Sequence, residues 1–297
     1  MKHADYLQRV LFDDINVRCV WVSLERVLDD ILADSDYPPA VTRLLTESLL
    51  VVAMLSSGLK FRGRISLQLQ ARGALSLLMA DCTESGGLRA IARLSEHAEI
   101  PGTAEQLLAD VARGGNLSLT LDPVNGGQRW QGIVPLEGHG LADAVRAYFE
   151  LSEQLPTRFC LAVDERQACG LMIQQMPGGD NDQDDDGWNR LEHLLATLGS
   201  REMLANDGET LFRRLFHQEP HQVLEPSPLS FYCPCSRERV LDVLEGLGAE
   251  EIQAMILEEN TIEVRCQFCN RAYHFDPIDL ATLGHDSSDD DAPPTVH

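Results

Sequence analysis

The chain has 297 residues, which is long enough for one full hydrophobic core and one or two smaller units. Its hydrophobic content of 44% is ordinary for a globular protein, and its net charge of −23 disfavours a nucleic-acid partner, because phosphate binding needs clustered Lys and Arg. The N-terminal segment carries acidic residues where a signal peptide has its apolar stretch, and the longest purely apolar run, Leu49 to Leu55, is too short to span a bilayer.

These features predict a cytoplasmic protein with no membrane partner. In that compartment thiols stay reduced, so a cluster of cysteines indicates metal or redox chemistry rather than structural disulfides.

The first predicted region, residues 1–178, begins with helical patterns. Ser23 is a candidate N-cap for a helix whose apolar face includes Val27 and Ile31. A second helix is predicted from the Pro38-Pro39 pair to Gly58.

The apolar period then changes to two. Ile65–Leu69 and Leu117–Leu121 alternate with polar residues and read as half-buried strands. A hairpin around Asn125-Gly126-Gly127, a helix over 141–153 and two more strands complete this region. The grouping of strands predicts an α+β domain of largely antiparallel sheet packed with helices.

The second predicted region, residues 179–230, is an acidic and then helical linker. Five Asp residues lie between Asp180 and Asp186 and cannot pack, which indicates a solvated boundary. Two short amphipathic segments follow, 188–198 and 211–216, and each is too short to be stable unless it packs on a neighbour. We therefore expect a metastable linker.

The third predicted region, residues 231–284, is too small to build much core by itself. We expect two helices here, over 236–247 and 250–257, then a β-hairpin and a last short helix, followed by a disordered tail over 285–297.

This small region contains two close pairs of cysteines, Cys233 and Cys235 in a C-x-C pattern and Cys266 and Cys269 in a C-x-x-C pattern. Two such pairs suit one Zn²⁺ held by four thiolates, and the spacing favours zinc over an iron–sulfur cluster. The other cysteines, Cys19, Cys82, Cys160 and Cys169, lie among apolar residues and are predicted to be small buried hydrophobes. No Ser/His/Asp, paired-carboxylate or phosphate-loop pattern is present, so we predict no catalytic residues and no enzyme activity.

Zinc alone does not define a function. There are three alternatives. One is a purely structural zinc domain, another is a zinc-ribbon nucleic-acid or ribosome-associated module, and the third is a thiol–disulfide oxidoreductase that uses Cys266 and Cys269. The net charge argues against the nucleic-acid module, and a C-x-x-C inside a hairpin rather than at a helix start argues against the oxidoreductase. Oxidation of zinc thiolates to disulfides would release the ion and remove the folding energy of the region, so a redox switch is physically available.

Sequence motifs along the whole chain resemble the bacterial redox-regulated chaperone family called heat-shock protein thirty-three. The resemblance rests on these segments: Leu59-Lys60-Phe61, Ile65 to Gln70, Tyr148-Phe149, Ser152 to Arg158, Gln174 to Pro177, Cys233 to Arg239, and Cys266 with Cys269.

This resemblance implies an ATP-independent holdase for the oxidative stress response. The reduced form would be inactive and would hold one zinc ion on Cys233, Cys235, Cys266 and Cys269. Oxidation would switch it by forming two disulfides, one between Cys233 and Cys235 and one between Cys266 and Cys269. The middle region then unfolds and uncovers an apolar surface, and the protein, as a homodimer, binds unfolding client proteins. Residues 1–178 would bind clients and dimerise, and residues 231–284 would be the redox switch.

Overall fold

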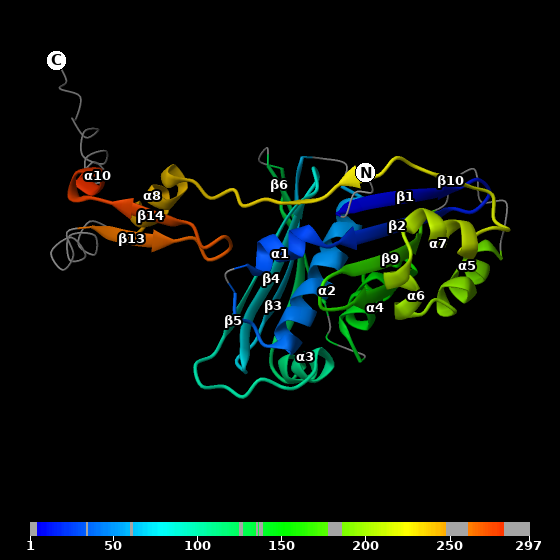
Figure 1. Cartoon of the computed structure of the whole chain (residues 1–297), viewed down its shortest axis with the longest axis horizontal. Helices are drawn as coiled ribbons and strands as arrows, with labels where there is room; N and C mark the ends of the chain where they lie inside the picture. Colours follow the sequence, from blue (N-terminus) through cyan, green and yellow to red (C-terminus); the bar gives the residue numbers. More distant parts are fainter. Residues whose placement is uncertain are drawn as a thin grey trace, which may run out of the picture. The chain divides into compact units, whose positions relative to one another are not determined.

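The computed structural model describes residues 5–33, 35–59, 62–124, 127–134, 136, 139–177, 186–247 and 261–281 (Figure 1). Contacts within the chain divide it into two compact units, Met1–Tyr232 and Cys233–His297, and each is described by itself. Most of the Asp180–Asp186 run, the predicted helix over 250–257 and the predicted disordered tail lie outside the described residues.

The first unit is built on two sheets, which we call sheet A and sheet B. Sheet A has the order β10-β1-β2-β9-β8, with β11 also paired to β1, and sheet B has the order β12-β5-β4-β3-β6-β7. The strands of sheet A are β1 (Tyr6–Phe12), β2 (Val17–Leu24), β8 (Thr157–Val163), β9 (Ala168–Gln175), β10 (His221–Val223) and β11 (Ser227–Pro228). Those of sheet B are β3 (Gly63–Gln70), β4 (Leu75–Thr83), β5 (Gly87–Leu94), β6 (Asn116–Pro123), β7 (Trp130–Val134) and β12 (Ser230–Phe231).

The pairing in both sheets is antiparallel except for β12, which runs parallel to β5. The predicted α+β fold with largely antiparallel sheets is therefore confirmed.

Helix α2 (Pro39–Ser56) packs on both sheets and forms the centre of the unit. A proline in the first turn starts the helix without losing a hydrogen bond, and fifteen of its eighteen residues are buried. It contacts β2, β8 and β9 on one side and β3, β4 and β5 on the other. Although α2 has the length and composition of a membrane-spanning helix, 83% of its apolar window is buried inside the protein. The other helices of this core are α1 (Arg26–Leu32), α3 (Ala104–Ala112) and α4 (Leu141–Leu151).

The predicted cap of the first helix is wrong. Ser23 lies in β2, where it pairs with Tyr6 on β1 and Cys169 on β9, and α1 starts three residues later after Glu25. Local spacing suggested a cap, but the strand extends to Leu24 because its residues are buried on both faces of the sheet.

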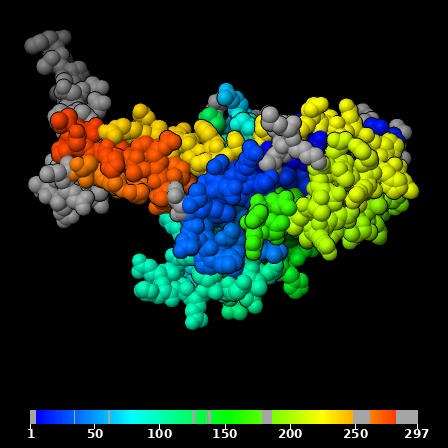
Figure 2. Space-filling view, in the orientation of Figure 1, coloured from blue at the N-terminus to red at the C-terminus, as the bar shows by residue number. Residues whose placement is uncertain are grey.

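Three short helices of the linker cover the face of sheet A that points away from α2. They are α5 (Gly187–Ala196), α6 (Ser200–Ala205) and α7 (Gly208–Leu215), and Asp207 caps α7 by accepting a hydrogen bond from the backbone N–H of Thr210 at 2.9 Å. Their apolar residues form one buried cluster with this face of the sheet, and their atoms make a continuous yellow-green surface (Figure 2).

After α7 the chain returns along the edges of both sheets; we call residues 220–232 the return segment. Backbone hydrogen bonds run from Asp13 N to Pro220 O (3.1 Å) and from Leu224 N to Arg9 O (2.9 Å) on β1. Further on, Tyr232 N donates to Leu88 O of β5 at 2.9 Å. The return segment thus closes an edge of sheet A and an edge of sheet B.

The second unit contains α8 (Arg237–Glu245), the hairpin of β13 (Ile262–Arg265) and β14 (Ala272–Phe275), and α10 (Pro277–Ala281). Among its described residues the buried core is small and consists of Leu244, Ile262, Phe275 and Leu280. A core of this size supplies little stability, so the unit needs another source of folding energy.

Candidate metal centre

Two backbone features hold the four predicted ligands. Cys233 and Cys235 lie just before α8, whose N-cap Ser236 accepts a hydrogen bond from the backbone N–H of Arg239 at 3.3 Å. The cap fixes the direction in which the chain leaves the first cysteine pair.

The second pair lies in the turn that joins β13 to β14. The backbone N–H of Cys266 donates to Arg271 O at 3.0 Å, and that of Asn270 donates to Cys266 O at 2.8 Å. Asn270 has a φ of 53°, in the left-handed region that Asn tolerates better than most residues. The turn therefore projects the side chains of Cys266 and Cys269 to the same side.

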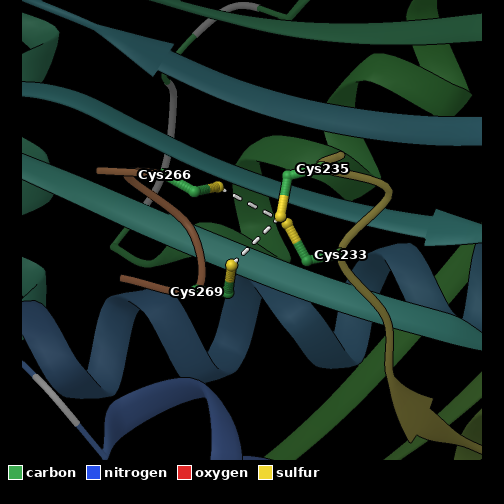
Figure 3. Close-up of side chains that lie close together, drawn as sticks. All are labelled: Cys233, Cys235, Cys266 and Cys269. Carbon is green, nitrogen blue, oxygen red and sulfur yellow. Dashed lines mark hydrogen bonds between the residues drawn. The ribbon is translucent and has the colours of Figure 1, made fainter. Parts of the chain in front are cut away.

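The structure brings all four sulfurs together, each within 4.8 Å of the others (Figure 3). The Sγ atoms of Cys233 and Cys266 are 3.6 Å apart, and those of Cys235 and Cys269 are 3.3 Å apart. Four sulfurs at 2.3 Å from a tetrahedral metal would be about 3.8 Å from one another. The donor set and its spacing therefore fit one metal ion.

The thiols of this cluster differ in pKa. Burial acts to raise the pKa of Cys235, but hydrogen bonds from Tyr273 and from the other three thiols outweigh it and lower the pKa to about 7. Burial raises the pKa of Cys233 and of Cys269, and their hydrogen bonds to neighbouring thiols raise it further. The arrangement thus favours a thiolate at Cys235, and thiolate is the form that binds metal.

Sequence reasoning did not find Tyr273 as a member of this site. Its hydroxyl donates to the Sγ of Cys235 at 3.1 Å, from a position on β14 directly opposite Val264. The only signal in the sequence was an aromatic residue four positions after Cys269, and the hairpin register was needed to place it.

Two of the arginines that flank the ligands, Arg237 and Arg239, bind the surrounding backbone. Arg239 donates to Pro234 O at 2.7 Å, within the first cysteine pair. Arg237 donates to His274 O at 2.7 Å, forms an ion pair with Asp279 at 2.6 Å and lies over the ring of Phe275. These contacts join α8 to the hairpin and so hold the two cysteine pairs at a fixed separation.

The other four cysteines lie in the first unit. Cys19, Cys82 and Cys169 are buried and Cys160 is half-buried, and all eight cysteines of the chain are free thiols. Burial raises the pKa of Cys160 to about 11 and that of Cys82 and of Cys169 to about 12. The prediction that they are small apolar residues holds for the first three, and Cys160 differs because it lies near the edge of the sheet.

Comparisons with known proteins agree over nearly the whole chain. The family model described as Hsp33 protein matches residues 5–276. The 33 kDa chaperonin of Pseudomonas paraeruginosa is 44% identical over 287 residues, which is 95% of each chain. The protein of the same name from Azotobacter vinelandii is 42% identical over the same length.

The crystal structure of the 33 kDa chaperonin (heat shock protein 33 homolog) from Thermotoga maritima superposes with a TM-score of 0.81. It is 22% identical and covers 95% of this chain and 98% of that one, so it establishes the same fold.

The alternatives raised from the sequence are not supported by these comparisons. The position of Cys266 and Cys269 in a hairpin turn also lacks the helix N-terminus that lowers thiol pKa values in oxidoreductases.

Proposed function

This chain belongs to the Hsp33 protein family, and from that membership we propose that it is a redox-regulated, ATP-independent holdase chaperone. The observation that carries the proposal is the meeting of four cysteine sulfurs, from segments about thirty residues apart, in a unit with a very small core. As a chaperone of this family it binds unfolded client proteins.

The metal is proposed to be zinc, one per chain, on Cys233, Cys235, Cys266 and Cys269. Four thiolates, with no oxygen or nitrogen donor beside them among the described residues, form a soft, tetrahedral set of the kind that zinc prefers in structural sites. When bound, the ion would link the segment before α8 to the β13–β14 turn and supply folding energy on the order of 10 kcal/mol or more.

Oxidation removes these donors. Two thiolates that become one disulfide give up two electrons to a peroxide or hypochlorite, which is reduced to water or chloride, and a disulfide sulfur no longer holds the metal. We propose that Cys233 pairs with Cys235 and Cys266 with Cys269. Once the two segments separate, each cysteine stays close only to its neighbour in the sequence, which supports this pairing.

The linker is proposed to be the element that responds. Helices α5–α7 have ten, six and eight residues, which is too short for independent stability, and they are held by burial against sheet A. When they leave, a face that includes Phe12, Trp21 and Ile173 becomes available to the apolar segments of a client.

The division of labour follows the proposed regions. Residues 1–178 would bind clients and form the homodimer of the oxidised protein, residues 179–230 would be the metastable linker, and residues 231–284 would be the switch. We propose that the protein acts in the cytoplasm, needs neither nucleic acid nor membrane, and catalyses no reaction.

Light scattering of a heat-denatured client, measured together with zinc release, tests this function. The reduced, zinc-loaded protein should not suppress aggregation, whereas peroxide at mildly raised temperature should release one zinc per chain and produce suppression. A Cys266→Ser variant should lose most of its zinc affinity and show suppression without oxidant, because three ligands no longer hold the unit together. Equal suppression by the reduced and the oxidised wild type would disprove the switch.

A further inference from the structure

Three thiols outside the metal centre share the linker-covered face of sheet A. Cys19 is on β2, Cys160 on β8 and Cys169 on β9, and all three pack in the cluster that this face forms with α5–α7. Cys19 is 0% exposed and Cys169 is 4% exposed, while Cys160 is half-buried. The remaining thiol, Cys82, is also 0% exposed but belongs to the other cluster, with α2.

The atoms that cover the three thiols come from the linker. The Cys160 thiol donates to Leu195 O of α5 at 4.0 Å, and α6 packs on both β8 and β9. Gly208, the first residue of α7, packs on the ring of Trp21, which lies two residues after Cys19 on the same face of β2. Departure of α5–α7 would therefore expose all three thiols and leave Cys82 buried.

Strand register prevents these thiols from pairing easily with one another. Cys160 lies opposite Leu171, and Cys169 lies opposite Ala162, so the two thiols are diagonal neighbours on adjacent strands. Diagonal neighbours are about 7–8 Å apart, beyond the usual range of a disulfide. Cys19 lies on β2, opposite Ile173 of β9, so β9 separates it from Cys160 on β8. An exposed thiol on this face would consequently react with an external disulfide.

We propose that Cys19, Cys160 and Cys169 form a linker-gated S-thiolation site, which accepts a low-molecular-mass disulfide such as oxidised glutathione once α5–α7 have left sheet A, and whose adducts keep the linker from returning. In this exchange the protein thiolate attacks one sulfur of glutathione disulfide. A mixed disulfide forms, the original disulfide bond breaks, and one glutathione leaves as a thiolate that takes up a proton. No further oxidant is required.

Burial explains why the site is closed while the linker is docked. It raises the pKa of Cys160 to about 11 and that of Cys169 to about 12, and it raises the pKa of Cys19 further, so all three are neutral thiols near pH 7. Solvent exposure removes this effect, and the thiolate is the reactive form.

Packing explains why an adduct would hold the linker away. Protein interiors have few voids larger than a water molecule, and the Cys19 and Cys169 side chains have almost no free surface. A charged tripeptide attached there cannot be enclosed beneath α5–α7. The modified chain would thus stay open after its zinc ligands are reduced, until its own mixed disulfides are reduced as well.

The proposal rests on the proposed function only for the signal that releases the linker, and the first experiment separates the two. Full-length protein is incubated with glutathione disulfide in three forms: reduced and zinc-loaded, oxidised, and a reduced Leu211→Asp variant in which a buried charge opens α7 without oxidant. Peptide mapping then measures mixed disulfides at each cysteine, with Cys82 as the internal control.

Adducts at Cys19 should form on the order of 100-fold faster in both opened forms than in the reduced wild type, and adducts at Cys169, which α5 and α6 cover, should do so in the oxidised form, with Cys82 unmodified in all three. Equal rates in closed and opened forms, or modification of Cys82 together with the other three, would overturn the gated site. Modification in the Leu211→Asp variant but not after oxidation would uphold the site and refute oxidative release of the linker.

A second experiment tests whether adducts on these thiols keep the linker from packing on sheet A again. In the oxidised form the zinc ligands are protected as disulfides, so N-ethylmaleimide can alkylate the exposed linker-face thiols selectively. The protein is then reduced, supplied with zinc and assayed for suppression of aggregation.

Alkylated wild type should remain active, whereas the Cys19→Ala/Cys160→Ala/Cys169→Ala variant should become inactive again, and Cys82→Ala should behave as wild type. Wild type carried through the cycle without alkylation is the reference, and it keeps the test valid if the triple variant does not fold. Full inactivation of alkylated wild type would refute the blocking role of the adducts.

Discussion

The two faces of sheet A are both buried, but by very different covers. One face packs on α2, a continuous helix of 18 residues that also contacts sheet B. The other packs on α5–α7, three helices of at most ten residues joined by turns. Both contacts are apolar, so the burial of surface alone does not distinguish them.

The difference lies in what each cover is attached to. Loss of α2 would expose apolar residues of both sheets and so unfold the first unit. Among the described residues the linker helices pack mainly on the outer face of sheet A, against β2, β8 and β9, so their loss leaves both sheets and α2 packed together. A region can thus be well buried and still open locally, since its opening does not require the rest of the fold to break.

The strongest test of this comparison uses two buried leucines. Leu45 of α2 is 0% exposed and Leu211 of α7 is 1% exposed. Truncation of either leucine to Ala should weaken the packing of its own helix on sheet A by about 2–5 kcal/mol. Leu45→Ala should lower the midpoint of global unfolding. Leu211→Ala should leave that midpoint nearly unchanged, increase proteolysis within 187–216 and give the reduced protein holdase activity. An equal loss of global stability in both variants would show that the two covers are not different in kind.

A smaller effect is expected from the first residue of α7. A Cβ at Gly208 would lie 2.7 Å from Trp21 Cδ1 and 2.9 Å from its Cγ, so Gly208→Val should push α7 from the sheet at a cost of about 1–3 kcal/mol. Gly199 is the N-cap of α6, and a Cβ there meets nothing within 4 Å, so Gly199→Val is the matched control. Hydrogen exchange of α7 amides measures both, and equal exchange in the two variants would contradict the role of the Trp21 contact.

The smallest expected effect concerns the ion pair that joins α5 to the residues after α7. Arg190 holds Glu219 through two hydrogen bonds, of 3.0 and 2.8 Å, and the Glu219 side chain is only 9% exposed. Glu219→Gln should destabilise the docked linker by about 1 kcal/mol, discounted because Arg190 is partly exposed.

The exposed pair between Arg213 and Glu209 provides the control for this ion pair. Both side chains are more than half exposed, so Glu209→Gln should change the stability by less than about 0.5 kcal/mol. The oxidant concentration at which activation is half complete measures both changes. An effect of Glu209→Gln as large as that of Glu219→Gln would mean that burial does not set the strength of these pairs.

Sequence reasoning succeeded where the signal is local. The apolar pattern after Pro38-Pro39 identified α2, the alternation at Ile65–Leu69 identified β3, and the Cys spacing led to four sulfurs that the fold brings together. In each case the period or spacing of a few residues carries the information.

It failed where the information is not local. Strand β2 is buried on both faces and shows no alternation, and α6 has only six residues. The shared face of Cys19, Cys160 and Cys169 depends on the register of β2 and β8 against β9, and the pairing of β2 with β9 connects residues more than 140 positions apart. Only the assembled sheet shows that these thiols form one group.

The return segment has one further consequence. Counted back from Tyr232, its backbone N–H groups donate first to Leu88 O of β5, then from Ser230 to Gly86 O, from Leu229 to Asp5 O, and finally from Leu224 to Arg9 O of β1. Tyr232 is covalently joined to Cys233. A displacement of that cysteine therefore acts first on one hydrogen bond, the one from Tyr232 to Leu88. The return segment can therefore separate from the sheets by breaking one hydrogen bond at a time, and its hydrogen bonds never have to break all at once.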